Sequence, residues 1–382
     1  MTKINSLYQE TVRIQEIVCG LLFSIFSFIY LFVFQRDILE AFHFSLAHGK
    51  THFSPFGSAF VMTLTLLLLR WAINRLVGLK NQFISLTYLP SFFVLMAISD
   101  IGRDVYTQNT HTFWLWMLPI LVVTFIGSLI IYKRKLHTLT PVSSGSKLSS
   151  INTNLVFMLL CCIATPIVGN TDTQFHYELQ VERCLRERNL DEAMRVGGKS
   201  MEASRTLTSL RAFTLSQNGM LGEKLFTYPQ YYGVDGLFFA DDSLAVLRYT
   251  NDSLFDYLGA SPRTAEGKLQ FLHDICYKDE GRYTALDYYL SALLLDKRLE
   301  SFATAISDFY DKEDSLPCHY REALLLYQKK NPQAVMMQQD SCLIQKFSDY
   351  QDRKQDLVLD AGNDNLMRRE YGETYWWYYD YQ

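Results

Sequence analysis

The strongest constraint in this sequence is a series of long apolar runs within its first 169 residues. Ile17 to Phe34 contains no charged side chain over 18 positions, which is enough helix to cross the hydrocarbon core of a membrane. Four more apolar segments follow, so the predicted transmembrane helices lie near residues 17–34, 56–79, 83–99, 113–132 and 151–169. The fifth segment also has the pattern of a buried core helix. The sequence therefore predicts a transmembrane domain at residues 1–169.

Charged residues are distributed unevenly along the chain. Residues 1–169 contain 12 Lys or Arg and 6 Asp or Glu, whereas residues 170–382 contain 24 and 34. This asymmetry indicates two physically different regions. The scarcity of charge in the first region excludes a single soluble domain and a disordered chain. The absence of a basic excess over the whole chain excludes a nucleic-acid binder that relies on one. We expect the lipid bilayer as a partner and no nucleic acid.

The Lys and Arg residues of the short loops predict how the chain is oriented in the membrane. If the N-terminus is cytoplasmic, eight such residues lie inside, including the run Lys133–Lys135. Only Arg36, Lys50 and Arg103 lie outside. The sequence thus predicts a protein of the bacterial cytoplasmic (inner) membrane, with a cytoplasmic N-terminus and with residues 170–382 exported.

The predicted exported domain, residues 170–382, has helical periodicity with charged faces. A polar turn between two helical segments occurs at Asn189–Ala193 and again at Arg298–Phe302. Short helix pairs of this kind resemble the tetratricopeptide repeat, although the spacing here is irregular and the canonical repeat has about 34 residues. The predicted fold class is all-α: five transmembrane helices followed by an exported, tetratricopeptide-like α-helical repeat domain. Another all-helical arrangement of the exported domain is the alternative.

Two segments of the exported domain do not fit the repeat pattern, an insertion near residues 228–262 and an aromatic tail at residues 371–382. Insertions in helical arrays often lie on the binding face, but a packing insertion with an acidic edge explains the composition equally well. The tail either docks into a partner or the membrane surface, or caps its own helical layer, and capping is slightly favoured. The candidate partner-binding residues are Tyr231, Tyr232, Phe238, Phe239, Trp376 and Trp377.

Three residues of the first predicted outer loop, Asp37, His43 and His48, have side chains suited to acid–base chemistry. Membrane glycosyltransferases that use lipid-linked sugars place a catalytic carboxylate in their first outer loop, so Asp37 resembles that carboxylate in position only. This gives an alternative function, a membrane transferase acting on a lipid-linked substrate at the outer membrane–water interface. The spacing of these residues matches no metal-ligand motif, and we predict no metal site and no cofactor.

Residues Ala193–Ser200 nearly match a phosphate-binding loop. That loop needs its first glycine and must follow a β-strand. Here Ala193 replaces the glycine and the preceding segment has helical periodicity. We therefore predict no nucleotide site at this position.

The predicted exported domain contains four cysteines, Cys184, Cys276, Cys318 and Cys342. An oxidising compartment would allow them to pair. Four cysteines permit three pairings, and the sequence does not choose among these or free thiols.

Three segments carry a resemblance to a known family. They are Leu221–Pro229 (LGEKLFTYP), Tyr320–Tyr327 (YREALLLY) and Thr374–Tyr379 (TYWWYY). With them the chain resembles a bacterial family of polytopic membrane proteins of unknown function with a tetratricopeptide-like helical C-terminal region. The resemblance implies apolar spans followed by a helical region, and it implies no catalytic residue.

These patterns favour a binding function. We expect an integral membrane protein whose exported helical-repeat surface binds a protein or peptide of the cell envelope, as a scaffold or assembly factor. Repeat arrays of this kind provide extended concave surfaces. The transferase is the alternative, and an enzyme is the less favoured class.

The topology predicts the behaviour of a reporter that is active only after export. A reporter fused after Gln382 should be active, because the fifth span would deliver the C-terminus outside. An inactive reporter on a stably inserted fusion would contradict the predicted topology, and a fusion within Lys133–Lys135 should be inactive as the matched control.

Overall fold

The computed structural model describes residues 2–47, 50–77, 84–103, 112–136, 147–240, 248–263, 266–311, 315–333, 340–359 and 364–382. Within these ranges every regular element is a helix. The all-α prediction is therefore confirmed for the described residues. The chain divides into two compact units, Met1–His176 and Tyr177–Gln382. The predicted domain boundary, after Gly169, lies a few residues earlier.

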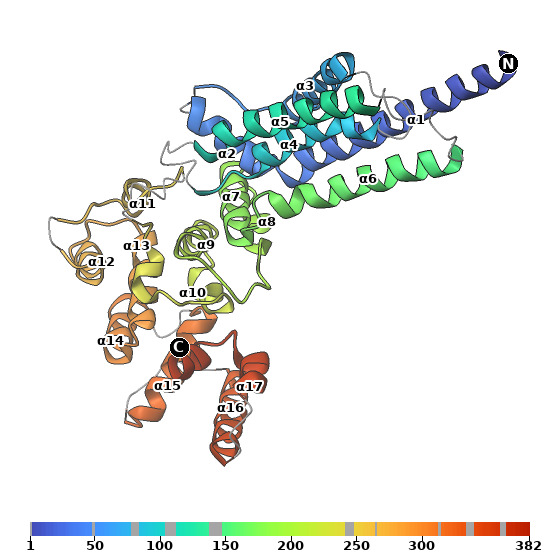
Figure 1. The fold of residues 1–382 in the computed structure, drawn as a ribbon. Helices are drawn as coiled ribbons and strands as arrows, with labels where there is room; N and C mark the ends of the chain where they lie inside the picture. Colours follow the sequence, from blue (N-terminus) through green and yellow to red (C-terminus); the bar gives the residue numbers. More distant parts are fainter. Residues whose placement is uncertain are drawn as a thin grey trace. The chain divides into compact units, whose positions relative to one another are not determined.

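The first unit consists of long apolar helices with short connecting elements. Its elements are α1 (Thr2–Ile29), the π-helix η1 (Tyr30–Phe34), α2 (Arg36–Ala47), α3 (Pro55–Val77), the 3-10 helix η3 (Ser85–Tyr88), α4 (Leu89–Ser99), α5 (Thr112–Leu136) and α6 (Lys147–Val168). Figure 1 shows α1, α3, α4, α5 and α6 running alongside one another, and α4 packs against α3, α5 and α6.

Two helices of this unit are long and apolar enough to cross a membrane among the described residues. They are Arg13–Phe34, with 22 residues, and Pro55–Val77, with 23 residues. A third span results if the bent helix pair Thr153–Val168 and Thr173–Arg186 is counted as one span. Two further helices, Ile84–Ser99 and Trp116–Ile131, are apolar but shorter. Membrane-spanning capacity is thus confirmed for the first two predicted segments. That all five segments cross stays a prediction.

The second half of helix α1, from Ile17 to Ile29, is predominantly apolar on both its exposed and its buried face. Ile17, Leu21 and Ile25 recur every four residues on its exposed face, whereas Phe23 is fully buried. The Phe23 ring packs edge-on against Phe92 with centroids 5.0 Å apart. A helix that is apolar all round is typical of a membrane span rather than of a soluble surface helix.

Polar groups join the chain segments at the C-terminal ends of α4 and α6. The backbone N–H of Asn170 donates to the carbonyl of Ser99 (2.9 Å), and its Nδ2 donates to the carbonyl of Ile101 (2.7 Å). At Gly169 an added Cβ would lie only 2.8 Å from Ser99 Oγ and 3.0 Å from Tyr30 Oη. The close approach therefore requires a glycine at this position.

The second unit is built from shorter helices. Helix α7 (Thr173–Arg186) crosses the division between the units. It is followed by α8 (Leu190–Arg195), α9 (Arg205–Gln217), α10 (Leu221–Lys224), the 3-10 helices η5 (Leu225–Thr227) and η6 (Gly233–Leu237), α11 (Asn251–Leu258), α12 (Lys268–Tyr277), α13 (Thr284–Leu295), α14 (Leu299–Phe309), α15 (Cys318–Lys330), α16 (Ser341–Leu359), α17 (Asp364–Tyr371) and α18 (Tyr375–Tyr381).

Consecutive helices of this unit pack against one another. From α12 to α18 each helix contacts the next one, and α13 and α15 are buried over most of their length. Such sequential contact is typical of helical arrays. Whether the pairs are tetratricopeptide repeats stays a prediction.

Three helix pairs are joined by the same left-handed turn. Helices α7, α9 and α13 end with positive φ at Arg188 (57°), Gly219 (65°) and Lys297 (57°). At each turn the positive-φ residue donates to the carbonyl three residues back, and the next residue donates to the carbonyl five back. This is the Schellman pattern, which satisfies helix-end carbonyls and favours glycine at the left-handed position. The turns predicted at Asn189 and Arg298 directly follow two of these residues.

This geometry predicts opposite stability changes at two matched positions. Gly219→Ala should lower the free energy of unfolding of the helical unit by about 1 kcal/mol, because a Cβ disfavours the left-handed conformation. An added Cβ meets nothing within 4 Å, so no steric clash contributes. Arg188→Gly, at an exposed position with the same backbone conformation, should raise the free energy of unfolding by a similar amount, because it removes the Cβ. Urea unfolding of the detergent-solubilised chain, followed by circular dichroism, measures both, and equal stability of the two variants would contradict this assignment.

Candidate functional site

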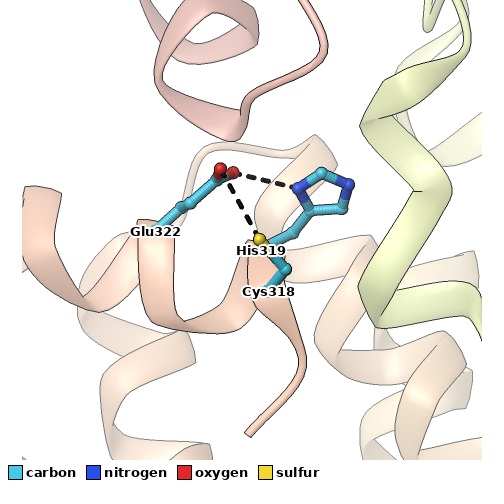
Figure 2. A group of neighbouring side chains, drawn as sticks. All are labelled: Cys318, His319 and Glu322. Atoms are coloured by element: carbon cyan, nitrogen blue, oxygen red, sulfur yellow. Dashed lines mark hydrogen bonds and ion pairs between the residues drawn. The ribbon is translucent and has the colours of Figure 1, made fainter. Parts of the chain in front are cut away.

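The first turn of α15 carries a compact group of chemically capable side chains, Cys318, His319 and Glu322 (Figure 2). His319 Nδ1 lies 2.9 Å from Glu322 Oε2, and Cys318 Sγ lies 3.8 Å from Glu322 Oε1. His319 and Glu322 are each about 2% exposed. Positions i, i+1 and i+4 share a helix turn, so this sequence spacing brings the three groups together.

The hydrogen bonds of His319 determine its tautomer. The backbone N–H of Phe226 donates to His319 Nε2 (3.3 Å), so this nitrogen presents its lone pair. The proton of a neutral ring therefore lies on Nδ1 and is donated to Glu322 Oε2. The same carboxylate oxygen accepts the backbone N–H of Tyr375 (2.8 Å).

This arrangement does not fit a metal centre or a nucleophile. A metal on His319 Nδ1 would need the ring proton on Nε2, where it would face the N–H of Phe226. Burial, with a smaller contribution from the nearby carboxylate, raises the pKa of the Cys318 thiol to about 11. The nucleophilic form of cysteine is the thiolate, so this thiol is unsuited to nucleophilic attack at neutral pH.

The group instead holds the C-terminal helix in place. Besides the Tyr375 N–H bond to the carboxylate, Trp376 Nε1 donates to the backbone carbonyl of Glu322 (2.8 Å). The Phe226 ring packs against the rings of both His319 and Tyr375, with centroids 5.1 and 5.0 Å apart. We call these five residues, Phe226, His319, Glu322, Tyr375 and Trp376, the tail clasp. The sequence analysis did not identify the tail clasp. The sequence signal for it is the spacing of His319 and Glu322, which lie three residues apart and so share one face of a helix.

A pocket of about 320 Å³ lies beside the tail clasp. It is formed by three segments of the second unit: the 198–201 segment after α8, the 226–230 segment that begins the insertion, and α17–α18. We call it the tail pocket. Its size is at the lower end of that of ligand pockets, which is about 300–1,000 Å³. The pocket thus brings together parts of the insertion and of the aromatic tail, the two segments that the sequence analysis singled out for binding.

Arg368 connects the tail to the insertion at the rim of this pocket. Its guanidinium lies 5.4 Å from the centroid of the Trp377 ring, and its Nη2 donates to Tyr231 Oη (3.2 Å). Tyr231 Oη in turn donates to the carbonyl of Met201 (2.6 Å). One arginine therefore fixes the relative positions of three segments.

A buried arginine, Arg211, stands behind the pocket wall. Its Nη2 donates to the carbonyls of Val196 (3.2 Å) and Gly197 (2.8 Å), and its guanidinium lies 5.0 Å from the Tyr228 ring centroid. Its Nε and Nη1 have no hydrogen-bond partner. Burial lowers the pKa of Arg211 to about 10, so the side chain stays charged at neutral pH.

The motif that resembles a phosphate loop forms part of the same wall. Its glycines follow α8, a helix, as the sequence indicated. The backbone N–H of Gly198 donates to the carbonyl of Arg195 (3.2 Å), and that of Ser200 donates to Gly197 (2.9 Å). These two amides are used within the turn and do not form a phosphate cradle.

The six candidate partner-binding residues differ sharply in exposure. Tyr231 and Tyr232 are 50% and 37% exposed, whereas Phe238, Phe239, Trp376 and Trp377 are buried. Phe238 is buried beside α9, where its backbone carbonyl accepts a hydrogen bond from Ser209 Oγ (2.7 Å). That these six residues bind a partner stays a prediction. Of the six, Tyr231 and Tyr232 are the ones exposed at the surface in this structure.

The candidate transferase residues belong to the first unit. Asp37 is half-buried in the first turn of α2. His43, on the same helix, shares a hydrogen bond between its Nε2 and Thr51 Oγ1 (3.1 Å). His48 lies outside the described residues. The transferase interpretation stays a prediction.

All seven cysteines are free thiols in this structure.

Comparison with known proteins gives one match. The model of a family described as "Family of unknown function (DUF6057)" matches residues 103–260 and 245–382, which together make up more than half of the chain. No curated protein and no solved structure matches the chain.

The tail clasp predicts that Glu322→Gln releases the C-terminal helix. A glutamine whose oxygen accepts from His319 Nδ1–H and the Tyr375 N–H turns its NH2 group toward the Cys318 sulfur, a weak acceptor, and so leaves a buried donor without a good partner. An unpaired buried donor costs about 2 kcal/mol, which raises the equilibrium population of the opened tail about thirtyfold. Chymotrypsin should therefore cleave within residues 371–382 faster, as followed by mass spectrometry.

The control for this measurement is Glu300→Gln, which makes the same change at an exposed position on α14. Equal cleavage rates in the two variants would show that Glu322 does not hold the tail.

Proposed function

The chain belongs to the DUF6057 family of unknown function, and we propose that it is an integral membrane protein that presents an exported helical-repeat surface for binding a protein or peptide of the cell envelope. The observation that carries this proposal is the tail pocket, where the insertion and the aromatic tail meet. Two candidate binding segments far apart in sequence share one concave surface on a helical unit. Ligand sites are typically concave and few per protein.

The proposed anchor consists of five spans. Arg13–Phe34 and Pro55–Val77 satisfy the length and hydropathy of a span. Helix α5 has 25 residues and α6 has 22, and both are apolar over most of their length. The α6 helix is better taken as a span by itself than joined to α7, because α7 contains Glu178, Glu182 and Arg183, which are costly in a bilayer. The Lys and Arg bias of the short loops then supports an exported second unit.

The proposed contact surface is centred on Tyr231 and Tyr232. Tyrosine and arginine are enriched at protein interfaces, where a rigid ring supplies contact area at low entropic cost. Here both tyrosine hydroxyls are held by backbone carbonyls, Tyr231 Oη by Met201 and Tyr232 Oη by Ala203 (3.2 Å). The rings are therefore fixed before a partner arrives, which reduces the ordering cost of binding.

A double variant tests this surface. Tyr231→Ala with Tyr232→Ala should remove most of a partner that co-purifies in stoichiometric amount with the tagged chain from its native host, because the main aromatic contacts are lost. Hot-spot aromatics contribute about 2 kcal/mol each, so we expect at least a tenfold loss by quantitative mass spectrometry.

The matched control is Tyr283→Ala, which removes a tyrosine that is 90% exposed and directly precedes α13, outside both candidate binding segments. Helix content of all variants is measured by circular dichroism. A partner that is retained by the double variant, or lost equally from Tyr283→Ala, would contradict the proposed surface.

A further inference from the structure

The tail pocket has a charge opposite to that of the region around it. Residues 170–382 contain 34 acidic and 24 basic side chains. The pocket lining contains three basic side chains, Lys199, Arg368 and Arg369, and one acidic side chain, Glu373. A locally positive concave surface on an acidic unit concentrates anionic ligands and discriminates against cationic ones.

The three basic side chains have no carboxylate partner among the residues that the structure describes. Arg368 interacts with the Trp377 ring and the Tyr231 hydroxyl, both of which are neutral. Lys199 and Arg369 are exposed at the pocket and form no ion pair within the described ranges. Other surface cations of this unit do pair, as Arg353 does with Glu370. The positive charge of the pocket is therefore available to a ligand.

Arg211 adds a fixed positive charge behind the wall. It lies beneath Tyr228, a lining residue, and its charged groups contact backbone carbonyls and a neutral ring. Its Nε and Nη1 remain without hydrogen-bond partners. In a poorly solvated wall such a charge is weakly screened, so it raises the potential felt in the pocket.

The walls also favour an apolar group next to the anion. Tyr228, Pro229 and Trp377 line the pocket beside the basic side chains. Guanidinium groups match the planar geometry of a carboxylate and bind it through paired hydrogen bonds. By contrast, the amides of Gly198 and Ser200 are already bonded within their turn, so the wall lacks the backbone cradle of a phosphate site.

We propose that the tail pocket binds an acidic segment of a peptide or protein partner. A carboxylate of that segment pairs with Arg369 and Lys199, and a neighbouring apolar side chain packs against Tyr228 and Trp377. This inference rests on the proposed binding function and names the chemistry of its partner. The pocket volume, about 320 Å³, suits a few side chains rather than a folded domain.

The test uses the full chain in detergent micelles and a fluorescein-labelled peptide of alternating Glu and Leu. Fluorescence anisotropy measures its binding and that of matched peptides with Gln or Lys in place of Glu. We expect the Glu peptide to bind most tightly and to weaken as salt rises, because charge pairing is screened. Lys199→Glu with Arg369→Glu should weaken its binding by about tenfold or more, because each exposed pair contributes up to about 1 kcal/mol and reversal adds repulsion.

The control variant is Arg263→Glu, which reverses an exposed arginine outside the pocket. It should bind the Glu peptide as the unmodified chain does. Equal weakening by Arg263→Glu would show a general charge effect and overturn the site. Competition with inorganic pyrophosphate distinguishes a phosphate site. The carboxylate assignment would be overturned if the Glu peptide bound no better than the Gln peptide and pyrophosphate displaced it.

The remaining outcomes separate this inference from the proposed function. If the Gln or Lys peptide binds better than the Glu peptide, the acidic chemistry is wrong while peptide binding stands. If no peptide binds although a partner co-purifies through Tyr231 and Tyr232, the pocket assignment fails and the proposed function survives. If that partner is also absent, both fail.

Discussion

Removing a carboxylate from water is costly unless hydrogen bonds replace its hydration, and the second unit meets this constraint at Glu322. The carboxylate accepts from His319 Nδ1 and from the backbone of Tyr375, and the Cys318 thiol lies beside it. One of these donors comes from α18, more than fifty residues further along the chain. The buried acid is therefore satisfied only when the aromatic tail is in place, which couples the tail to the core of the unit.

The tail pocket depends on that coupling. Helices α17 and α18 supply one wall, and the segment after Phe226 supplies another. Because Phe226 packs between His319 and Tyr375, the same clasp positions both walls. The shape of a pocket made from three separate segments thus depends on a polar group that is itself buried.

The first unit follows a different physical rule. In a bilayer every backbone polar group must be satisfied within the chain, so long apolar segments form helices. Exposed apolar residues such as Ile17, Leu21 and Ile25 are then compatible with lipid, whereas in water they would form an unfavourable patch. The polar contacts of Asn170 with Ser99 and Ile101 join the ends of these helices.

The amino-acid sequence was sufficient to predict the helical character of both regions, the first two membrane-competent segments and the polar turns that begin at Asn189 and Arg298. These are local properties, because uncharged runs and polar turns act over one helix length. Only the packing of distant segments determines which aromatic residues of the insertion and the tail are exposed, because Tyr231 is half exposed whereas Phe238, seven residues later, is buried. It also brought Lys199 to Arg368 and Arg369, which are too far apart in sequence for any local pattern to connect. A pocket is a long-range property, because burial and charge at one residue are set by distant segments that pack around it.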